Sequence, residues 1–214
     1  MSLTEEQLKA LAQQLGKPDG EHGINVANMM HDSNIGMTRS TYNALNLTKN
    51  DTILELGHGN GKHITEILSI ADGITYSGLE ISDLMKTEAE SQALKNTSFT
   101  LYNGIIIPFE AEVFKKAMTV NTIYFWQEPV KLFNEVYRVL KTKGILTIGF
   151  AHKQFMETLP FTQHGFNLYD DDKLANLVAQ TNFTLVSIIQ YKEQVRSKAD
   201  EMVERVYAVA TLQK

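Results

Sequence analysis

The sequence contains no cysteine and no apolar run near the roughly 18 residues that a membrane-spanning helix requires. Without cysteine there is no disulfide and no thiolate metal site, which fits a reducing compartment. The first residues, MSLTEEQLKALAQQL, are polar and amphipathic rather than signal-like. We therefore expect a protein of the cytoplasm with no membrane span.

Positive charge is also scarce and scattered. The chain has 20 Lys and Arg against 25 Asp and Glu, and only Lys115 and Lys116 are adjacent. Nucleic-acid binding requires a clustered basic face, so the sequence favours a small-molecule substrate and no nucleic acid. A length of 214 residues with 43% hydrophobic residues predicts one globular domain, 1–214. Nothing in the sequence indicates an oligomeric state.

The most unusual stretch that the sequence does have is DTILELGHGNGKH, at residues 51–63. An apolar, strand-forming run ends at Glu55, and Gly57, Gly59 and Gly61 follow on alternate positions. Glycines directly after a buried strand allow a tight turn and close approach to a ligand, and the N-terminus of the next helix points at the same place. In open α/β sheets such a crevice holds nucleotide-like ligands.

The glycine spacing disfavours two common nucleotide loops. The dinucleotide pattern G-x-G-x-x-G requires glycine at position 62, which is Lys62. The phosphate-binding pattern G-x-x-x-x-G-K-[ST] requires Ser or Thr after Lys62, where the chain has His63, and a glycine at position 56, which is Leu56. The stretch therefore argues against NAD, FAD and a phosphate site.

Polar residues end two other predicted strands. Glu80 closes the strand 75–80 and lies near the spacing at which α/β folds present a carboxylate to a ribose diol. A solvated acid opening the next helix is the alternative. Asn121 and Thr122 stand at the end of the strand within 116–120, beside the glycine loop if the strand order reverses there. A strand-ending turn residue is the alternative for Asn121.

Helical and strand patterns alternate along the chain, which predicts an α/β fold with a doubly wound sheet. Helices are expected at 4–15 (capped by Thr4 and Gln7), 24–45, 63–71, 129–140 and 170–180. Strands are expected at 52–54, 75–80, 98–102, 116–120 and 145–150, and an antiparallel pair at 183–190 and 203–211 with a polar linker between them.

The run Glu55-Leu56-Gly57-His58-Gly59-Asn60-Gly61 resembles the first motif of class I S-adenosylmethionine-dependent methyltransferases. The loop RVLKTKG, at 138–144, resembles the RVLKPGG of the small-molecule methyltransferase type 11 group, with the proline and one glycine replaced. The resemblance covers the chain from about Ile24 onward. It implies a Rossmann-like sheet of seven strands in the order 3-2-1-4-5-7-6 with the last strand antiparallel, and S-adenosylmethionine as cofactor.

The resemblance also implies which residues meet the cofactor. They lie at the carboxyl ends of the first four strands: Glu55, Gly57, His58, Gly59, Gly61, Glu80, Ile81, Gly104, Ile105, Asn121 and Thr122. The family typically has an Asp after the third strand, and the matching place here is Ile105. The backbone of Gly104 and Ile105 is expected to bond the adenine edge, with Ile105 packing either on the adenine face or in the core at the sheet edge.

The substrate is expected between an N-terminal helical cap, 1–45, and a lid segment, 151–169, both outside the strands of a Rossmann-like core, 46–214. The candidate substrate residues are His31, Asn34, Met37, Tyr124, Trp126 and His164. Structural packing is the alternative for each of them, since methionine and aromatic side chains more often fill a core.

The sequence therefore predicts methyl transfer from S-adenosylmethionine to a small, partly apolar acceptor. A non-catalytic cofactor-binding or scaffold module is the alternative, and a nicotinamide-dependent oxidoreductase is disfavoured by the glycine spacing. A general base is needed only for a hydroxyl or protonated amine acceptor. The candidates are His31, His152, His164, Tyr124 and Glu128, and none is singled out. No metal is expected, because His58 and His63 lack a third ligand.

Overall fold

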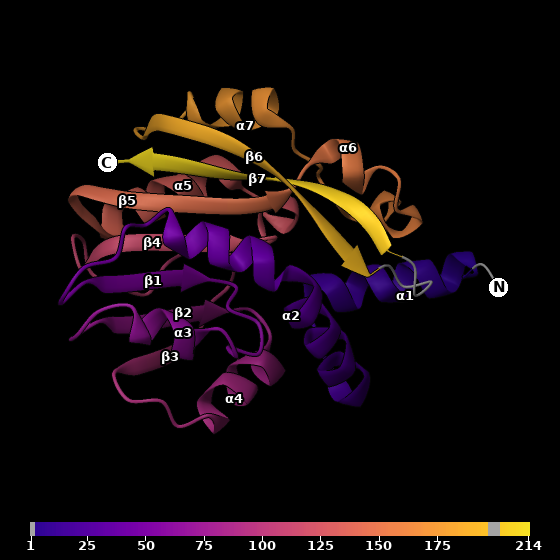
Figure 1. Ribbon diagram of the computed structural model, residues 1–214, viewed down its shortest axis with the longest axis horizontal. Coiled ribbons are helices and arrows are strands. Elements are labelled where there is room, and N and C mark those ends of the chain that lie inside the picture. Colours follow the sequence, from indigo (N-terminus) through magenta and orange to yellow (C-terminus); the bar gives the residue numbers. More distant parts are fainter. Residues whose placement is uncertain (1–2, 197–201) are drawn as a thin grey trace.

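The computed structural model of the chain describes residues 3–196 and 202–214. In this part of the chain seven strands form one sheet in the order β3-β2-β1-β4-β5-β7-β6 (Figure 1). β7 is antiparallel to both of its neighbours, whereas the other pairs are parallel. The predicted fold and strand order are confirmed. The strands are β1 Thr52–Leu56, β2 Thr75–Glu80, β3 Thr97–Leu101, β4 Phe114–Val120, β5 Leu140–Ala151, β6 Thr184–Arg196 and β7 Met202–Gln213.

The helices follow the predicted order, with shifted ends. They are α1 Glu5–Gly16, α2 Gly20–Asn43, α3 Ile64–Ser69, α4 Asp83–Ser91, α5 Pro129–Val139, α6 Lys153–Met156 and α7 Asp171–Val178, with 3-10 turns η1 Ile123–Phe125 and η2 Pro160–Gln163. Thr4 and Gln7 form the expected capping box of α1. α2 begins four residues before the predicted Ile24, because the carboxylate of Asp19 accepts the amide of Gly20 and caps the helix there.

The centre of the sheet is apolar, as the sequence of β1 predicts. Ile53, Leu54 and Leu56 are fully buried, and β1 lies between β2 and β4. α2 packs against β4 and β5. A Cβ at Gly149 of β5 would collide with the hydroxyl of Thr41, so this glycine allows the close approach of α2. α1 and the first half of α2 extend past the carboxyl ends of the central strands (Figure 1).

The loop predicted at 138–144 is largely part of β5, which begins at Leu140. β5 pairs with β4 at Leu140 and again from Ile145, and the residues between them make a register shift. Arg138 lies in the last turn of α5 and holds a more distant segment. Its guanidinium donates to the carbonyls of Phe109 at 2.7 Å and Ile107 at 2.9 Å, which fixes the segment that follows β3.

The β6–β7 hairpin is longer than predicted, because the polar residues expected as a linker pair as far as Arg196 and Met202. Residues 197–201 of that linker lie outside the described residues. Arg205 of β7 is buried and forms an ion pair with Glu193 of β6 at 2.6 Å. It also donates to the side-chain oxygen of Asn34 at 2.7 Å, so the hairpin is attached to α2.

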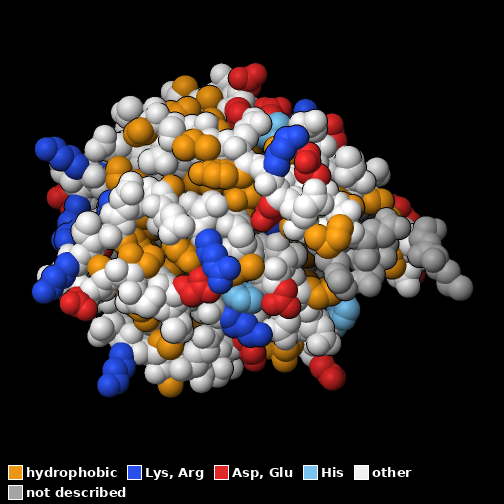
Figure 2. Space-filling view, viewed as in Figure 1, with side chains coloured by type: hydrophobic (Ala, Val, Ile, Leu, Met, Phe, Trp, Pro, Cys, Tyr) orange, Lys and Arg blue, Asp and Glu red, His pale blue; other side chains and the backbone are white. Residues whose placement is uncertain are grey.

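The surface around α2 is mixed in character. Figure 2 shows acidic and basic side chains side by side on this face, and an apolar area over the β5–β7 part of the sheet. Val186 and Ile189 of β6 are among the exposed hydrophobic residues. Among the residues that the structure describes, no helix has the length and apolar character to cross a membrane.

Candidate functional site

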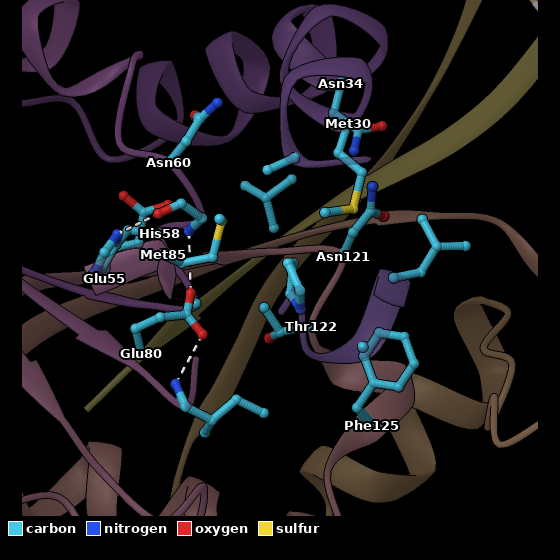
Figure 3. A pocket seen from close by; sticks show the side chains of 18 of the residues that line it. Met30, Asn34, Glu55, His58, Asn60, Glu80, Met85, Asn121, Thr122 and Phe125 are labelled. Carbon is cyan, nitrogen blue, oxygen red and sulfur yellow. Dashed lines mark hydrogen bonds between the residues drawn. The ribbon is translucent and has the colours of Figure 1, made fainter. Parts of the chain in front are cut away.

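A cavity opens at the carboxyl ends of β1, β2 and β4, where the strand order reverses (Figure 3). This is the place at which open α/β sheets bind ligands. One side of the cavity is formed by residues that follow β1 and β2, and the other by α1, α2 and the segment after β4. We call these sides the loop half (residues 55–60 and 80–85, with His63, Tyr102 and Gly104) and the cap half (residues 15–38 and 120–126).

The glycine loop keeps the loop half open. Gly57 and Gly59 line the cavity with φ angles of 74° and 58°, a region that favours glycine. A Cβ at Gly57 would collide with the methyl group of Thr122, whereas a Cβ at Gly59 would have no atom of the described chain within 4 Å. Gly61 does not line the cavity. A Cβ there would lie 3.0 Å from Ala89, so this glycine packs the loop onto α4.

Glu80 is buried at the end of β2 and is held by backbone amides. Its Oε1 accepts from Ile81 at 2.7 Å and Ser82 at 3.2 Å, and its Oε2 accepts from Gly59 at 3.1 Å. Burial raises the pKa of Glu80, and the three amides oppose that shift. A carboxylate has about four acceptor positions, so one position on Oε2 stays open toward the cavity. The open position suits a donor such as one ribose hydroxyl. Two hydrogen bonds from a ribose diol, as the sequence suggested, would need an open position on each carboxylate oxygen.

Glu55 is fixed from below the loop by two buried donors. His63 Nε2 lies 2.8 Å and the Tyr76 hydroxyl 2.5 Å from Glu55 Oε2. Burial disfavours both charges, but the attraction between them prevails, so the pKa of Glu55 is lowered and that of His63 is raised. Both residues also line the cavity. The pair makes the floor of the loop half charged and rigid.

His58 lines the cavity too, but its ring packs away from the loop. The ring lies 5.0 Å from that of Phe99, and a Cβ at Gly78 would fall 2.5 Å from its Cδ2. Nδ1 donates to the carbonyl of Gly59 at 2.8 Å, and Nε2 has no hydrogen-bond partner among the described residues. Burial lowers the pKa of His58 to about 4, so the ring is neutral at pH 7.

The segment after β3 reaches the cavity through Tyr102 and Gly104 but not through Ile105. The side-chain oxygen of Asn103 accepts the amides of Ile105 at 3.0 Å and Ile106 at 2.8 Å. The backbone amide of Ile105, which the sequence analysis expected at the adenine edge, therefore already donates to Asn103. Ile81 also lines the cavity, next to Glu80.

A chain of hydroxyl groups fixes the end of β4. The Trp126 indole donates to Thr122 Oγ1 at 3.1 Å, the hydroxyls of Thr122 and Thr119 lie 2.5 Å apart, and Thr119 Oγ1 donates to the Leu56 carbonyl at 2.8 Å. Asn121 has a φ of 56°, which asparagine tolerates better than most residues. Asn121, Thr122 and Trp126 all line the cavity.

The turn between α1 and α2 closes the cap half. The Ser82 hydroxyl donates to the carbonyl of Pro18 at 2.6 Å, which ties this turn to the end of β2. A Cβ at Gly16 would lie 3.1 Å from the Phe125 ring, so α1 rests on the segment after β4. His31 lines the cavity from α2, and burial lowers its pKa.

Three of the predicted substrate residues lie elsewhere. Met37 is fully buried in the core cluster, and Tyr124 is buried behind Asn121, to which its hydroxyl donates at 2.9 Å. His164 Nε2 lies 3.2 Å from a Glu5 carboxylate oxygen. No described residue of the predicted lid, 151–169, lines the cavity. Within this segment η2 packs against α1 and α6 packs against β7.

Other residues line the cavity although the sequence did not mark them: Leu15, Gly16, Pro18, Ala27, Met30, Thr38, Asn60, His63, Met85, Tyr102, Val120 and Phe125. Most lie in the cap half. The segment 16–20 falls between the two predicted helices 4–15 and 24–45, and no local sequence pattern indicates its contact with the β2–α4 turn. The aromatic cluster at 124–126 was the available signal for Phe125.

Of the candidate bases, only His31 lines the cavity. His152 lies 3.7 Å from Asp171 and accepts the Gln154 amide, and Glu128 is exposed beside Lys131. Within residues 3–196 and 202–214, no group of three or more His, Asp or Glu side chains is arranged to hold a metal ion.

Residues 54–148 match the family model described as a methyltransferase domain. Among curated proteins, the uncharacterized methyltransferase YdaC of Bacillus subtilis (strain 168) is 29% identical over 118 residues, which is 54% of this chain. The match spans 65% of the length of YdaC.

Solved structures share the fold at low identity. A chain from the complex that contains the Haloferax volcanii Trm112 methyltransferase activator has a TM-score of 0.74 at 13% identity, with 98% of both chains covered. A geranyl diphosphate C-methyltransferase of Streptomyces coelicolor, in complex with Mg²⁺, geranyl diphosphate and S-adenosyl-L-homocysteine, has a TM-score of 0.68 at 12% identity and covers 94% of this chain and 88% of its own.

The donor set of the loop half fits an adenosyl group. Glu80 offers an open acceptor position, and the surface at Gly59 has room for a ligand. Together with the glycine motif, the sheet order and the family match, these observations identify the domain. Residues 54–148 therefore carry a methyltransferase domain, on a sheet whose strand order is the one that the class I motif implies, and S-adenosylmethionine is the cofactor that this motif implies.

Proposed function

We propose that the protein transfers a methyl group from S-adenosylmethionine to a small, partly apolar acceptor. The observation that carries the proposal is that a single cavity has one side suited to the cofactor and another suited to the acceptor. Glu80 and Gly59 stand on one side, and Leu15, Met30 and Phe125 stand on the other. The bound cofactor supplies a methyl group on a positively charged sulfur, so the protein needs no nucleophile of its own.

The loop half binds and orients the cofactor in this proposal. Glu80 Oε2 accepts a ribose hydroxyl, and the backbone at Gly59 lies against the ligand. Ile81 and Gly104 lie near the adenine. Because the loop is fixed from below by Glu55 and His63, binding requires little ordering of the protein.

The cap half positions the acceptor and excludes water. Alignment of the acceptor with the methyl group in a closed, apolar space supplies much of the rate acceleration in such transfers. Where the acceptor must lose a proton, His31 is the base that the cavity offers, because its lowered pKa leaves the ring unprotonated at neutral pH. We also propose that residues 1–45 and 46–214 act as one domain, since the cap half depends on both.

Isothermal titration calorimetry with S-adenosylhomocysteine tests the proposal. We expect a dissociation constant below about 100 μM, a modest affinity for such a site. No binding at that concentration would overturn the function. Binding without turnover, measured against a broad acceptor panel, would favour the non-catalytic module.

A further inference from the structure

Two asparagine side chains meet the cap half of the cavity from different elements. Asn34 comes from α2 and Asn121 from the end of β4, and both are partly buried (Figure 3). A primary amide has a donor end and an acceptor end, and which end faces the cavity decides what it recognises. The hydrogen bonds of the two residues determine this orientation.

The oxygen of Asn121 faces the protein. It accepts the backbone amide of Ala151 at 3.0 Å and the Tyr124 hydroxyl at 2.9 Å. A backbone N–H can only donate, so a flipped amide would set two donors against each other. The single hydroxyl proton of Tyr124 is shared with the Ala151 carbonyl, which also lies 2.9 Å away, and this contact holds Tyr124 behind Asn121. The NH₂ group of Asn121 is the end that remains for the cavity.

The oxygen of Asn34 is fixed in the same way. It accepts from the guanidinium of Arg205 at 2.7 Å, and a guanidinium has no acceptor. Arg205 is itself held by the Ser33 carbonyl and by Glu193. Within the described part of the chain, neither asparagine NH₂ group has a hydrogen-bond partner. Figure 3 shows both side chains on the same side of the cavity as Met30, away from Glu80.

We infer that the methyl acceptor carries a hydrogen-bond-accepting oxygen, of a ketone, ester or carboxylate, and that Asn34 and Asn121 bind it. This rests on the proposed function and specifies its substrate class. Among the described residues, the carboxylates that line the cavity are Glu55 and Glu80 of the loop half, so the described cap half offers an ammonium group no anionic partner. A protonated amine, which has no hydrogen-bond acceptor, would meet only the N–H groups of the two asparagines there. The inference also assigns Asn121 to binding of the methyl acceptor, whereas the sequence analysis placed it at the cofactor.

The test measures binding of three probes that share a benzyl group, with and without saturating S-adenosylhomocysteine. Phenylacetate carries a carboxylate, 1-phenyl-2-propanone a ketone and phenethylamine an ammonium group. Dissociation constants come from ligand titration monitored by ¹⁵N–¹H spectra, in which the side-chain NH₂ signals of Asn34 and Asn121 are assigned from variants. We expect the two oxygen probes to bind at least 10-fold more tightly than the amine and to shift both NH₂ signals.

Asn121→Asp and Asn34→Asp each keep one oxygen for the protein groups that donate to it now. Each replaces the NH₂ group that faces the cavity with a carboxylate oxygen, which accepts hydrogen bonds. Each is expected to invert the preference, so that phenethylamine binds more tightly than the ketone. Asn43→Asp adds the same charge at an exposed site on α2 and should leave the preference unchanged. Equal or stronger binding of the amine to the unaltered protein, or no binding of either oxygen probe, would overturn the inference. Absent binding of S-adenosylhomocysteine in the same samples would instead overturn the proposed function.

Discussion

The two halves of the cavity differ in how far apart their residues lie in the sequence. The loop half comes from short, contiguous segments: the ends of β1 and β2 supply its two carboxylates, and the loop after β1 supplies Gly57 and Gly59. The cap half combines α1, α2 and the end of β4, and depends on Arg205 from the far end of the chain. A site made of local segments can evolve and be altered independently, whereas one assembled from distant segments depends on the fold around it.

The largest expected effect is the loss of stability when Arg205 is replaced. Arg205→Met leaves Glu193 without its buried partner and frees the Asn34 amide, so we expect the free energy of unfolding to fall by about 3 kcal/mol. Urea unfolding measures it. Lys192→Met is the matched control, because it removes the exposed Lys192–Glu204 pair of the same hairpin and should cost under about 1 kcal/mol. Equal losses in the two variants would contradict the distinction between the halves.

The next effect belongs to the loop half. Glu80→Gln removes the charge that an adenosyl hydroxyl would bind, and we expect the affinity for S-adenosylhomocysteine to fall by about 1 to 3 kcal/mol. Calorimetry measures the change. Asp83→Asn, an exposed acid three residues away, serves as control and should leave the affinity unaltered. An unchanged affinity in Glu80→Gln would show that Glu80 does not hold the cofactor.

Two glycines with similar backbones separate ligand contact from backbone strain. Gly59 and Gly165 both have a positive φ, and a Cβ at either would have no protein atom within 4 Å, but only Gly59 lines the cavity. Alanine at either position should cost roughly 1 to 2 kcal/mol of stability. Only Gly59→Ala should also weaken S-adenosylhomocysteine binding, by about 10-fold. A matching loss of affinity in Gly165→Ala would refute a direct contact at Gly59.

The smallest effect concerns the floor of the loop half and depends on pH. The pKa of His63 is raised, so its contribution to stability is complete below its unfolded value of 6.5 and is lost as pH rises through the folded value. The pKa of Glu55 is lowered, so its contribution is present above 4.5 and is lost as pH falls. We expect His63→Gln to cost about 1 kcal/mol between pH 4.5 and 6.5, and less above. Urea unfolding across pH 4 to 9 checks this, and a constant difference would contradict it.

The sequence indicates which residues of the loop half lie together, because its signals there are local. Strand, acid and alternate glycines lie within 51–63, and the sheet order follows from the alternation of elements and the family resemblance. Gly61 and Ile105 were placed at the cofactor because sequence spacing does not show which side of a loop faces a cavity. In the structure Gly61 packs against α4, and Asn103 engages the amide of Ile105.

The cap half was predicted less well, for a physical reason. Met37 and Asn34 lie three residues apart on one helix, yet one faces the core and the other the cavity, and only tertiary packing decides between them. Phe125 lines the cavity while its neighbour Tyr124 supports Asn121 from behind. The role of Arg205 depends on a pairing across more than 170 residues, which no local pattern reveals.

A crystal structure with S-adenosylhomocysteine bound tests the account most directly, because it locates both halves at once. We predict a ribose hydroxyl within hydrogen-bond distance of Glu80 Oε2 and the ligand against Gly59, with the sulfur directed toward the space between Asn34 and Asn121. A ligand that lies outside this cavity, or one whose ribose makes no contact with Glu80, would contradict the account.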